Sequence, residues 1–300
     1  MSVARPVIPG RTCLITRRTQ GRTLLFRPDP RINNYYLYFL AYYAERYGIE
    51  VHLVVLMSDH EHLVVTDRFG QLPNFYRDFH RLVANGVKNV HGWDGEVWDG
   101  AQTSCVELFT PKAVIEELAY AMANPVEAGL VHKAEDWPGI MVLPEQLGHK
   151  TWTLQRPDIY LSRDNPQWPA QATLQLTMPQ HYLSDEELRS RVALELETLQ
   201  AAARARLKAE GRRILGRAAI LATSPKARAS SWEAIRGRNP TIAVGRGQKT
   251  AFRQAVQALR TFRKKYNEAL EKWRCGIRDV LFPTHTWQMN WLHQVQVEPG

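Results

Sequence analysis

The chain has 300 residues, 44% hydrophobic and 23% charged, with a formal net charge of +9, which is ordinary for a folded globular protein apart from the basic excess. No stretch approaches the roughly eighteen apolar residues of a membrane span, and the first residues lack the apolar core of a secretory signal. Cys13, Cys105 and Cys275 are too few and too far apart for a disulfide framework or a cysteine zinc site, so a cytoplasmic protein is expected.

The first 140 residues predict an alternation of strands and helices. In chain order we expect a strand (12–20), a helix (29–48), two strands forming a hairpin (49–58 and 61–67), a helix (72–92), a strand pair or bent strand (95–108) and a helix that opens at Thr110 and stops at Asn124–Pro125. This order favours an α+β fold of the ferredoxin-like type, with helices packed on an antiparallel sheet.

The rest of the chain changes in composition. Residues 141–182 are rich in Pro and Trp with little periodicity, and are expected to be a connector wrapped on the first domain (1–140). Residues 183–300 are expected to be a basic, mostly helical extension, with long helices over 183–216, capped by Ser184, and 248–276. Between residues 204 and 278 there are 20 Lys and Arg against 4 Asp and Glu, a net of +16, while the remainder carries −7. A basic segment beside a mildly acidic body is typical of nucleic-acid binding.

Two histidines stand at the head of an apolar run, in the sequence "HEHLVV" (60–65). On a strand, His60 and His62 point to one face and Glu61 to the other, so the two imidazoles can converge on one ion. The spacing alone also fits a pair of polar residues with no ligand.

The helix around "VIEELAYAMANP" (114–125) carries a second polar pair. Its apolar residues fill one continuous arc: Val114, Ile115, Leu118, Ala119, Ala121 and Met122. Tyr120 falls nearly opposite the centre of that arc, and Asn124 lies one turn on, so a phenol and a carboxamide share the polar face. Asn124 could supply a third ligand to a cation held by His60 and His62, with Tyr120 beside it as a nucleophile. The natural electrophile for such a tyrosine is a DNA phosphodiester.

Three stretches together resemble the single-tyrosine HUH transposases, and most closely the REP-associated tyrosine transposases: "VHLVVLMSDHEHLVV", "FYRDFHRLVANGVKNVHGWDGEVWDG" and "YAMANPVEAGLV". The resemblance covers about residues 10–140. It implies a ferredoxin-like HUH domain that cuts and rejoins single-stranded or hairpin DNA. His60, His62 and Asn124 would hold Mg²⁺ or Mn²⁺, and Tyr120 would form a 5′-phosphotyrosine and release a 3′-hydroxyl. A cytoplasmic, nucleoid-associated protein is implied, as a monomer or homodimer.

The chain departs from the family pattern in three respects. Glu61 stands where the family has a bulky hydrophobic residue, and its side chain is expected to face the helices, either near the sheet edge or in tension with the core. The stretch "GAQTS" (100–104) replaces a Gly-Arg-Tyr-like stretch, and the chain is about twice the usual catalytic length. These departures leave open a domesticated, non-catalytic DNA- or RNA-binding protein that keeps the fold.

Several cations are candidates for DNA contact. Arg17, Arg18 and Arg22 flank the first predicted strand and its turn, and the basic extension adds Arg236, Arg238, Arg246 and Lys249. The tyrosines crowded in the helix 29–48 follow helical spacing, which predicts packing in the core rather than stacking on bases.

Overall fold

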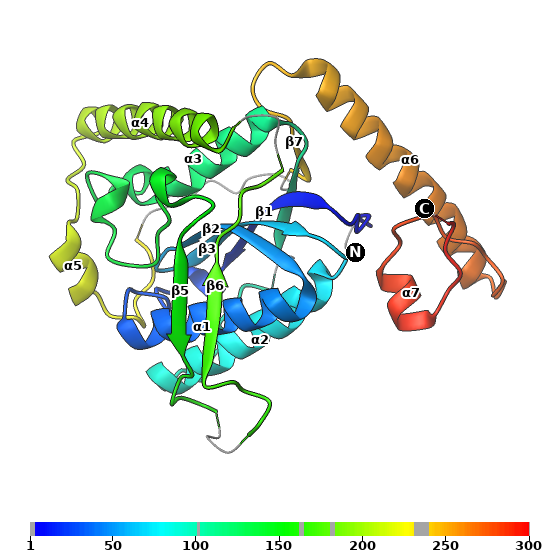
Figure 1. The fold of residues 1–300 in the computed structure, drawn as a ribbon, viewed down its shortest axis with the longest axis horizontal. Helices are drawn as coiled ribbons and strands as arrows, with labels where there is room; N and C mark the ends of the chain where they lie inside the picture. Colours follow the sequence, from blue (N-terminus) through cyan, green and yellow to red (C-terminus); the bar gives the residue numbers. More distant parts are fainter. Residues whose placement is uncertain (1–3, 101–102, 162–164, 181–183, 231–239, 300) are drawn as a thin grey trace.

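The computed structural model describes residues 4–100, 103–161, 165–180, 184–230 and 240–299 (Figure 1). The helices are α1 (Pro30–Tyr47), α2 (Leu72–His91), α3 (Pro111–Glu127), α4 (Asp185–Ala209), α5 (Arg217–Ala222), α6 (Lys249–Arg274) and α7 (Gln288–His293). The strands are β1 (Arg11–Arg18), β2 (Ile49–Leu56), β3 (His60–Asp67), β4 (Ser104–Leu108), β5 (Thr151–Gln155), β6 (Gln171–Gln175) and β7 (Ile242–Ala243). The predicted α+β class is confirmed.

The main sheet has the strand order β2-β3-β1-β4-β7. The pairs β2–β3, β3–β1 and β1–β4 are antiparallel, whereas the two-residue strand β7 pairs with β4 in parallel. The sheet is therefore mixed, and the expectation of a purely antiparallel sheet was wrong at this edge. Strand β7 comes from the basic extension, more than 130 residues after β4. Two residues are too few to show the alternation of apolar and polar side chains that predicts a strand.

Helices cover both faces of the main sheet, with α1 and α2 on one side and α3, backed by α4, on the other (Figure 1). The helix α1 is as aromatic as its sequence predicts, and it packs most of its tyrosines into the core: Tyr35, Tyr36, Tyr38 and Tyr43 are buried. The ring of Tyr36 packs edge-on against Phe79 of α2, and this contact helps to hold α1 against α2.

The first helices begin and end where short-range chemistry places them. The Asp29 side chain accepts hydrogen bonds from the backbone N–H groups of Arg31 and Ile32 at the start of α1, and Gly48 ends the helix in the left-handed conformation. At α3, the Thr110 side chain accepts from the N–H of Ala113.

The prediction that α3 stops at Asn124–Pro125 was wrong, because the helix continues to Glu127 with Pro125 inside it. Proline removes only its own N–H, and one turn from the end the ladder resumes when the Ala128 N–H donates to the Asn124 carbonyl at 2.9 Å. As a result Asn124 lies within a formed helical turn.

The range 141–182, expected to be an irregular connector, contains the hairpin β5–β6, which packs on α1. The hydroxyl of Tyr38 donates to the carbonyl of Pro169 at 2.6 Å, and Trp168 contacts Phe39 edge-on. The helix α4 also belongs to the main core, through Leu188 and Val192, so the core continues past residue 183.

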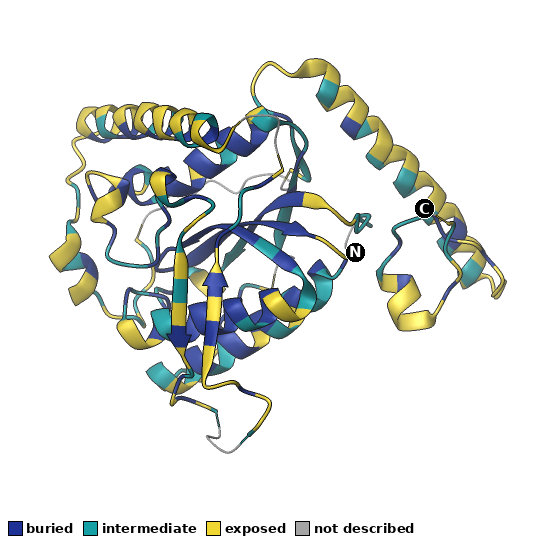
Figure 2. Ribbon diagram, in the orientation of Figure 1, coloured by how far each residue is buried: buried dark blue, intermediate teal, exposed yellow. Residues whose placement is uncertain are grey.

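The C-terminal part forms a smaller cluster of its own. Buried Phe282 and Met289 pack there with Ala269 of α6, while most of α6 is exposed (Figure 2). No helix in the described ranges combines the length and apolar character needed to cross a membrane.

Candidate metal and tyrosine site

The residues of the HUH motif lie where β3 begins. Strand β3 is interior to the sheet, between β2 and β1, and its alternation sends His60 and His62 toward α3 and Glu61 toward α1 and α2. The antiparallel register places Arg18 opposite His60 and Thr16 opposite His62, so these four side chains share one face. Both imidazoles are buried, with 6% and 2% exposure.

The two imidazoles converge on a single amide. Asn124 Oδ1 lies 3.1 Å from His60 Nε2, and Asn124 Nδ2 donates to His62 Nε2 at 3.0 Å. The rings of His60 and His62 stand nearly perpendicular, with centroids 4.9 Å apart. The fold thus brings Asn124 of α3 into one cluster with His60 and His62, which lie more than sixty residues earlier in the chain.

The other nitrogen of each ring is held by the protein. Asp59 Oδ1 accepts from His60 Nδ1 at 2.7 Å, and His62 Nδ1 donates to the hydroxyl of Thr16 at 2.9 Å. This arrangement leaves the Nε2 lone pair of His62 directed at Asn124. Burial lowers the pKa of His62 well below its usual range, and the charges of His60 and Arg18 lower it further, which keeps the ring neutral.

Asp59, which directly precedes the motif, is fixed in turn by Arg22. Arg22 Nε donates to Asp59 Oδ2 at 3.1 Å. Burial acts to raise the pKa of Asp59, but the hydrogen bond from His60 and the charges of His60 and Arg22 outweigh it and lower the pKa to about 2. A carboxylate is therefore kept beside His60 throughout the physiological range. Sequence reasoning missed Asp59, although its position next to His60 was a readable signal.

Tyr120 lies on α3 one turn before Asn124. Its ring centroid is 5.7 Å from that of His62 at an interplanar angle of 74°, and the side chain is 39% exposed, whereas its neighbours Ala119 and Ala121 are fully buried. The structure therefore brings Tyr120 to the edge of the histidine–asparagine cluster, where a substrate can reach it from solvent.

Glu61 is neither at the sheet edge nor in conflict with the core. Its side chain has 0% exposure, and its carboxylate accepts from the hydroxyl of Tyr36 at 2.7 Å and from His80 Nε2 at 2.5 Å. His80 Nδ1 accepts from Arg17 Nη1 at 2.7 Å, so a cation compensates the buried charge through the imidazole. Sequence reasoning missed His80, because a histidine inside a helix gives no signal of a partner on a strand.

The predicted DNA-binding cations do not form one group. Arg17 lies on the face with Glu61, opposite the face of Arg18, and Arg22 is engaged by Asp59. Arg246 makes ion pairs with Glu116 of α3 and Glu195 of α4, and Lys249 opens α6 at an exposed position. Arg236 and Arg238 lie outside the described residues, as does part of "GAQTS".

The candidate ligands for a divalent cation are His60, His62 and Asn124. Among the described residues, no group of three or more His, Cys, Asp and Glu side chains is placed to hold a metal ion. The set found is two imidazoles and an amide, and the 3.1 Å between His60 Nε2 and Asn124 Oδ1 matches the spacing of about 3 Å between neighbouring ligands of an octahedral Mg²⁺ with bonds near 2.1 Å. Each imidazole is also held at its second nitrogen, as in known metal sites. The residues therefore fit such an ion.

Two solved structures are similar to parts of this chain. A REP-associated tyrosine transposase bound to a REP hairpin aligns with 46% of this chain and 81% of its own, at 18% identity and a TM-score of 0.39. A candidate transposase from Deinococcus radiodurans R1 aligns with 35% of this chain and 85% of its own, at 17% identity and a TM-score of 0.28. No protein-family model and no curated protein sequence matches the chain. At these TM-scores the likeness carries no argument about activity, which has to come from the residues of the site.

Proposed function

We propose that the protein is a metal-dependent, tyrosine-nucleophile enzyme that cleaves and rejoins single-stranded or hairpin DNA. The observation that carries the proposal is the convergence of His60 and His62 on Asn124, which lies within hydrogen-bond distance of both, with the exposed ring of Tyr120 against His62. The order βαββαβ, with antiparallel neighbours β2-β3-β1-β4, supports the ferredoxin-like HUH domain that this chemistry uses.

In the proposed reaction His60, His62 and Asn124 hold a divalent cation, Mn²⁺ or Mg²⁺. When bound, this ion polarises the scissile phosphate and stabilises the charge that develops on it. Asp59 and Thr16 hold the Nδ1 atoms of the two imidazoles, which leaves each Nε2 directed toward Asn124, where the ion would bind. Two nitrogen ligands suit Mn²⁺ better than Mg²⁺, which prefers oxygen.

Tyr120 is the proposed nucleophile. Its hydroxyl oxygen attacks the phosphorus in line and loses its proton, the bond from phosphorus to the 3′ oxygen breaks, and that oxygen takes up a proton as a 3′-hydroxyl. The 5′-phosphate stays bound to Tyr120, and attack by a 3′-hydroxyl reverses the step, so strands can be rejoined without ATP.

The accommodation of Glu61 favours this enzyme over a non-catalytic nucleic-acid-binding protein. One of the departures that leave the non-catalytic alternative open is this charged residue in the strand that carries both histidines. Because Tyr36 and His80 hydrogen-bond that carboxylate on the far face of the sheet, β3 keeps its register and its histidine face.

The test is incubation of the purified full-length protein with labelled single-stranded oligonucleotides, with and without a hairpin, in Mn²⁺ or Mg²⁺. We expect a covalent protein–DNA adduct on denaturing gels, with the nucleotide mapped by mass spectrometry to the peptide that contains Tyr120. Tyr120→Phe should bind DNA and form no adduct. Tyr42→Phe, which removes a phenolic hydroxyl from α1 on the other face of the sheet, is the matched control and should react normally. An undiminished adduct from Tyr120→Phe, or none from the natural sequence, would refute the proposal.

A further inference from the structure

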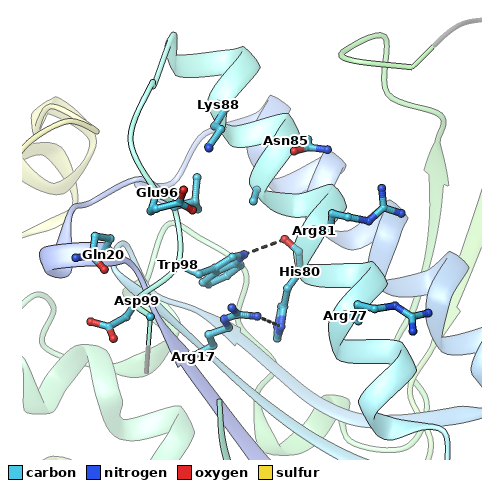
Figure 3. A pocket seen from close by; sticks show the side chains of 13 residues that line it. Arg17, Gln20, Arg77, His80, Arg81, Asn85, Lys88, Glu96, Trp98 and Asp99 are labelled. Atoms are coloured by element: carbon cyan, nitrogen blue, oxygen red, sulfur yellow. Dashed lines mark hydrogen bonds between the residues drawn. The ribbon is translucent and has the colours of Figure 1, made fainter. Parts of the chain in front are cut away.

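A cavity lined by several charged side chains lies on the opposite side of the sheet from His60 and His62. It has a volume of about 830 Å³ and opens between α2, the end of β1 and the segment 96–100 (Figure 3). This size is within the range of about 300–1,000 Å³ that is usual for pockets binding drug-sized ligands, a class that includes single nucleotides.

The cations that line the cavity come from two elements. Arg77, Arg81 and Lys88 project from α2, and Arg17 enters from β1, against the acidic residues Glu96 and Asp99. Arg77 is already engaged, because it pairs with Asp78 and its guanidinium lies over Trp291. Arg81 and Lys88, by contrast, form no ion pair with any described residue. The lining residues comprise four cations and two carboxylates, so the wall of the cavity is formally positive.

Arg17 is held in position within the wall. Its Nη1 donates to His80 Nδ1 at 2.7 Å, and its guanidinium lies 5.1 Å from the centre of the Trp98 ring. Trp98 is in turn fixed by a hydrogen bond of 2.9 Å from its Nε1 to the carbonyl of His80. Burial lowers the pKa of Arg17, opposed by the charges of Glu61 and Asp99. A guanidinium that has lost part of its hydration and is fixed by its neighbours binds an anion with little further ordering cost.

The remaining polar groups suit a base rather than a bare phosphate. The amides of Gln20 and Asn85 line the same cavity and can both donate and accept hydrogen bonds, whereas Trp98 is buried beneath Arg17 and holds that guanidinium in place. Single-strand binding sites combine cations that contact the backbone with polar groups that contact the edges of bases.

The cavity and the tyrosine site lie at the same end of β1 and β3, on opposite faces of the sheet. Arg17 and Arg18 are consecutive on β1, and Glu61 lies between His60 and His62 on β3, so each strand contributes to both faces. A strand of DNA that passes around this end of the sheet could reach both sites.

We propose that this cavity binds an unpaired nucleotide of the same DNA strand that is cleaved, with Arg17, Arg81 and Lys88 contacting its phosphates. The inference rests on the proposed function for the identity of the strand. Its consequence is a fixed spacing between the scissile phosphate and one recognised nucleotide.

The test measures DNA binding in the Tyr120→Phe background, where cleavage plays no part. We expect Arg81→Ala with Lys88→Ala to weaken binding of labelled single-stranded DNA and to reduce the slope of log affinity against log salt by about 1.4, at about 0.7 per lost phosphate contact. The ratio of variant to parent Kd should then fall about sevenfold between 50 and 200 mM salt. Arg46→Ala with Lys133→Ala removes the same charges from exposed positions outside the cavity and the basic extension, and is the matched control, expected to leave the slope unchanged.

Two further measurements separate the possible outcomes. The charge-preserving pair Arg81→Lys with Lys88→Arg should restore most of the affinity, and blunt duplex DNA should bind the parent and the alanine pair alike. As the oligonucleotide is shortened from one end, the affinities of the parent and of the alanine pair should become equal at the length where the nucleotide bound in the cavity is removed.

An alanine pair that matches the parent in affinity and slope, or that loses duplex binding equally, overturns the inference while an adduct at Tyr120 still supports the proposed function. Pocket-dependent binding without any adduct from the natural sequence would uphold the cavity as a single-strand site and refute the catalysis.

Discussion

Glu61 offers the sharpest test of how the sheet tolerates a charge inside the HUH motif. Its carboxylate accepts hydrogen bonds from Tyr36 and His80, and all three side chains are buried. In Glu61→Leu, which restores the hydrophobic character usual in the resembling family, both donors lose their acceptor. Removing one partner of a buried, hydrogen-bonded ionic group costs about 3–5 kcal/mol, so Glu61→Leu should destabilise the fold by about that amount.

Glu61→Gln should cost far less, about 1 kcal/mol. His80 Nδ1 accepts a hydrogen bond from Arg17, so His80 Nε2 carries the hydrogen and donates a hydrogen bond to Glu61. A glutamine can accept that hydrogen bond with its Oε1 and can donate one from its amide N–H to the hydroxyl of Tyr36, because a hydroxyl can also accept. Only the strengthening due to charge is lost.

The assay is urea denaturation followed by circular dichroism, with a double-mutant cycle between Glu61→Leu and Tyr36→Phe. The loss of stability caused by Glu61→Leu should be smaller by about 1–3 kcal/mol in the Tyr36→Phe background, because that background lacks one of the two donors that would be left without an acceptor. Equal stabilities of Glu61→Leu and Glu61→Gln, or a coupling of zero, would show that the buried hydrogen bonds do not stabilise β3 as argued.

Three further outcomes follow from the same geometry. Asn124→Ala should weaken Mn²⁺ binding by more than about tenfold while Asn124→Asp retains it, measured by calorimetry; equal affinities would remove Asn124 from the ligand set. Asp59→Asn should weaken Mn²⁺ binding by about 10–100-fold, because the carboxylate orients His60, and an unchanged affinity would contradict that role. Burial lowers the pKa of His62 and His80 below the usual 6.5, so below pH 6.5 the unfolded chain takes up protons that the native protein does not. Stability in EDTA should therefore fall as the pH is lowered from 7 to 5.5, by up to about 1.4 kcal/mol per pH unit for each histidine, and a flat or rising urea midpoint would contradict this.

The parts of the fold that could be predicted are those set by local chemistry. Gly48 and Thr110 mark helix ends through their own backbone and side-chain preferences, and the long helix of tyrosines was predicted as a core element from its spacing. Placing Tyr120 and Asn124 on one polar face needed only the helical period, and the structure brings that face to the histidines.

The parts that could not be predicted depend on contacts between distant segments. Strand β7 is two residues long and exists because β4 offers an edge, and the hairpin β5–β6 depends on the surface of α1. The burial of Glu61 required a histidine on α2 and a tyrosine on α1, neither of which differs in sequence from an ordinary helical residue. Local patterns carry no information about such partners.

The same alternation that gives β3 two chemical faces also protects its register. A slip of one residue would bring Glu61 toward Asn124 and send His60 and His62 toward Tyr36 and His80. The carboxylate would then lose both hydrogen-bond donors, and the imidazoles would lose Asp59 and Thr16, so both faces oppose the slip. In a motif with a hydrophobic middle residue, packing and the hydrogen bonds of the imidazoles alone would oppose it. The glutamate therefore makes the histidine pair more strictly placed in this chain, at the cost of dependence on His80 and Arg17.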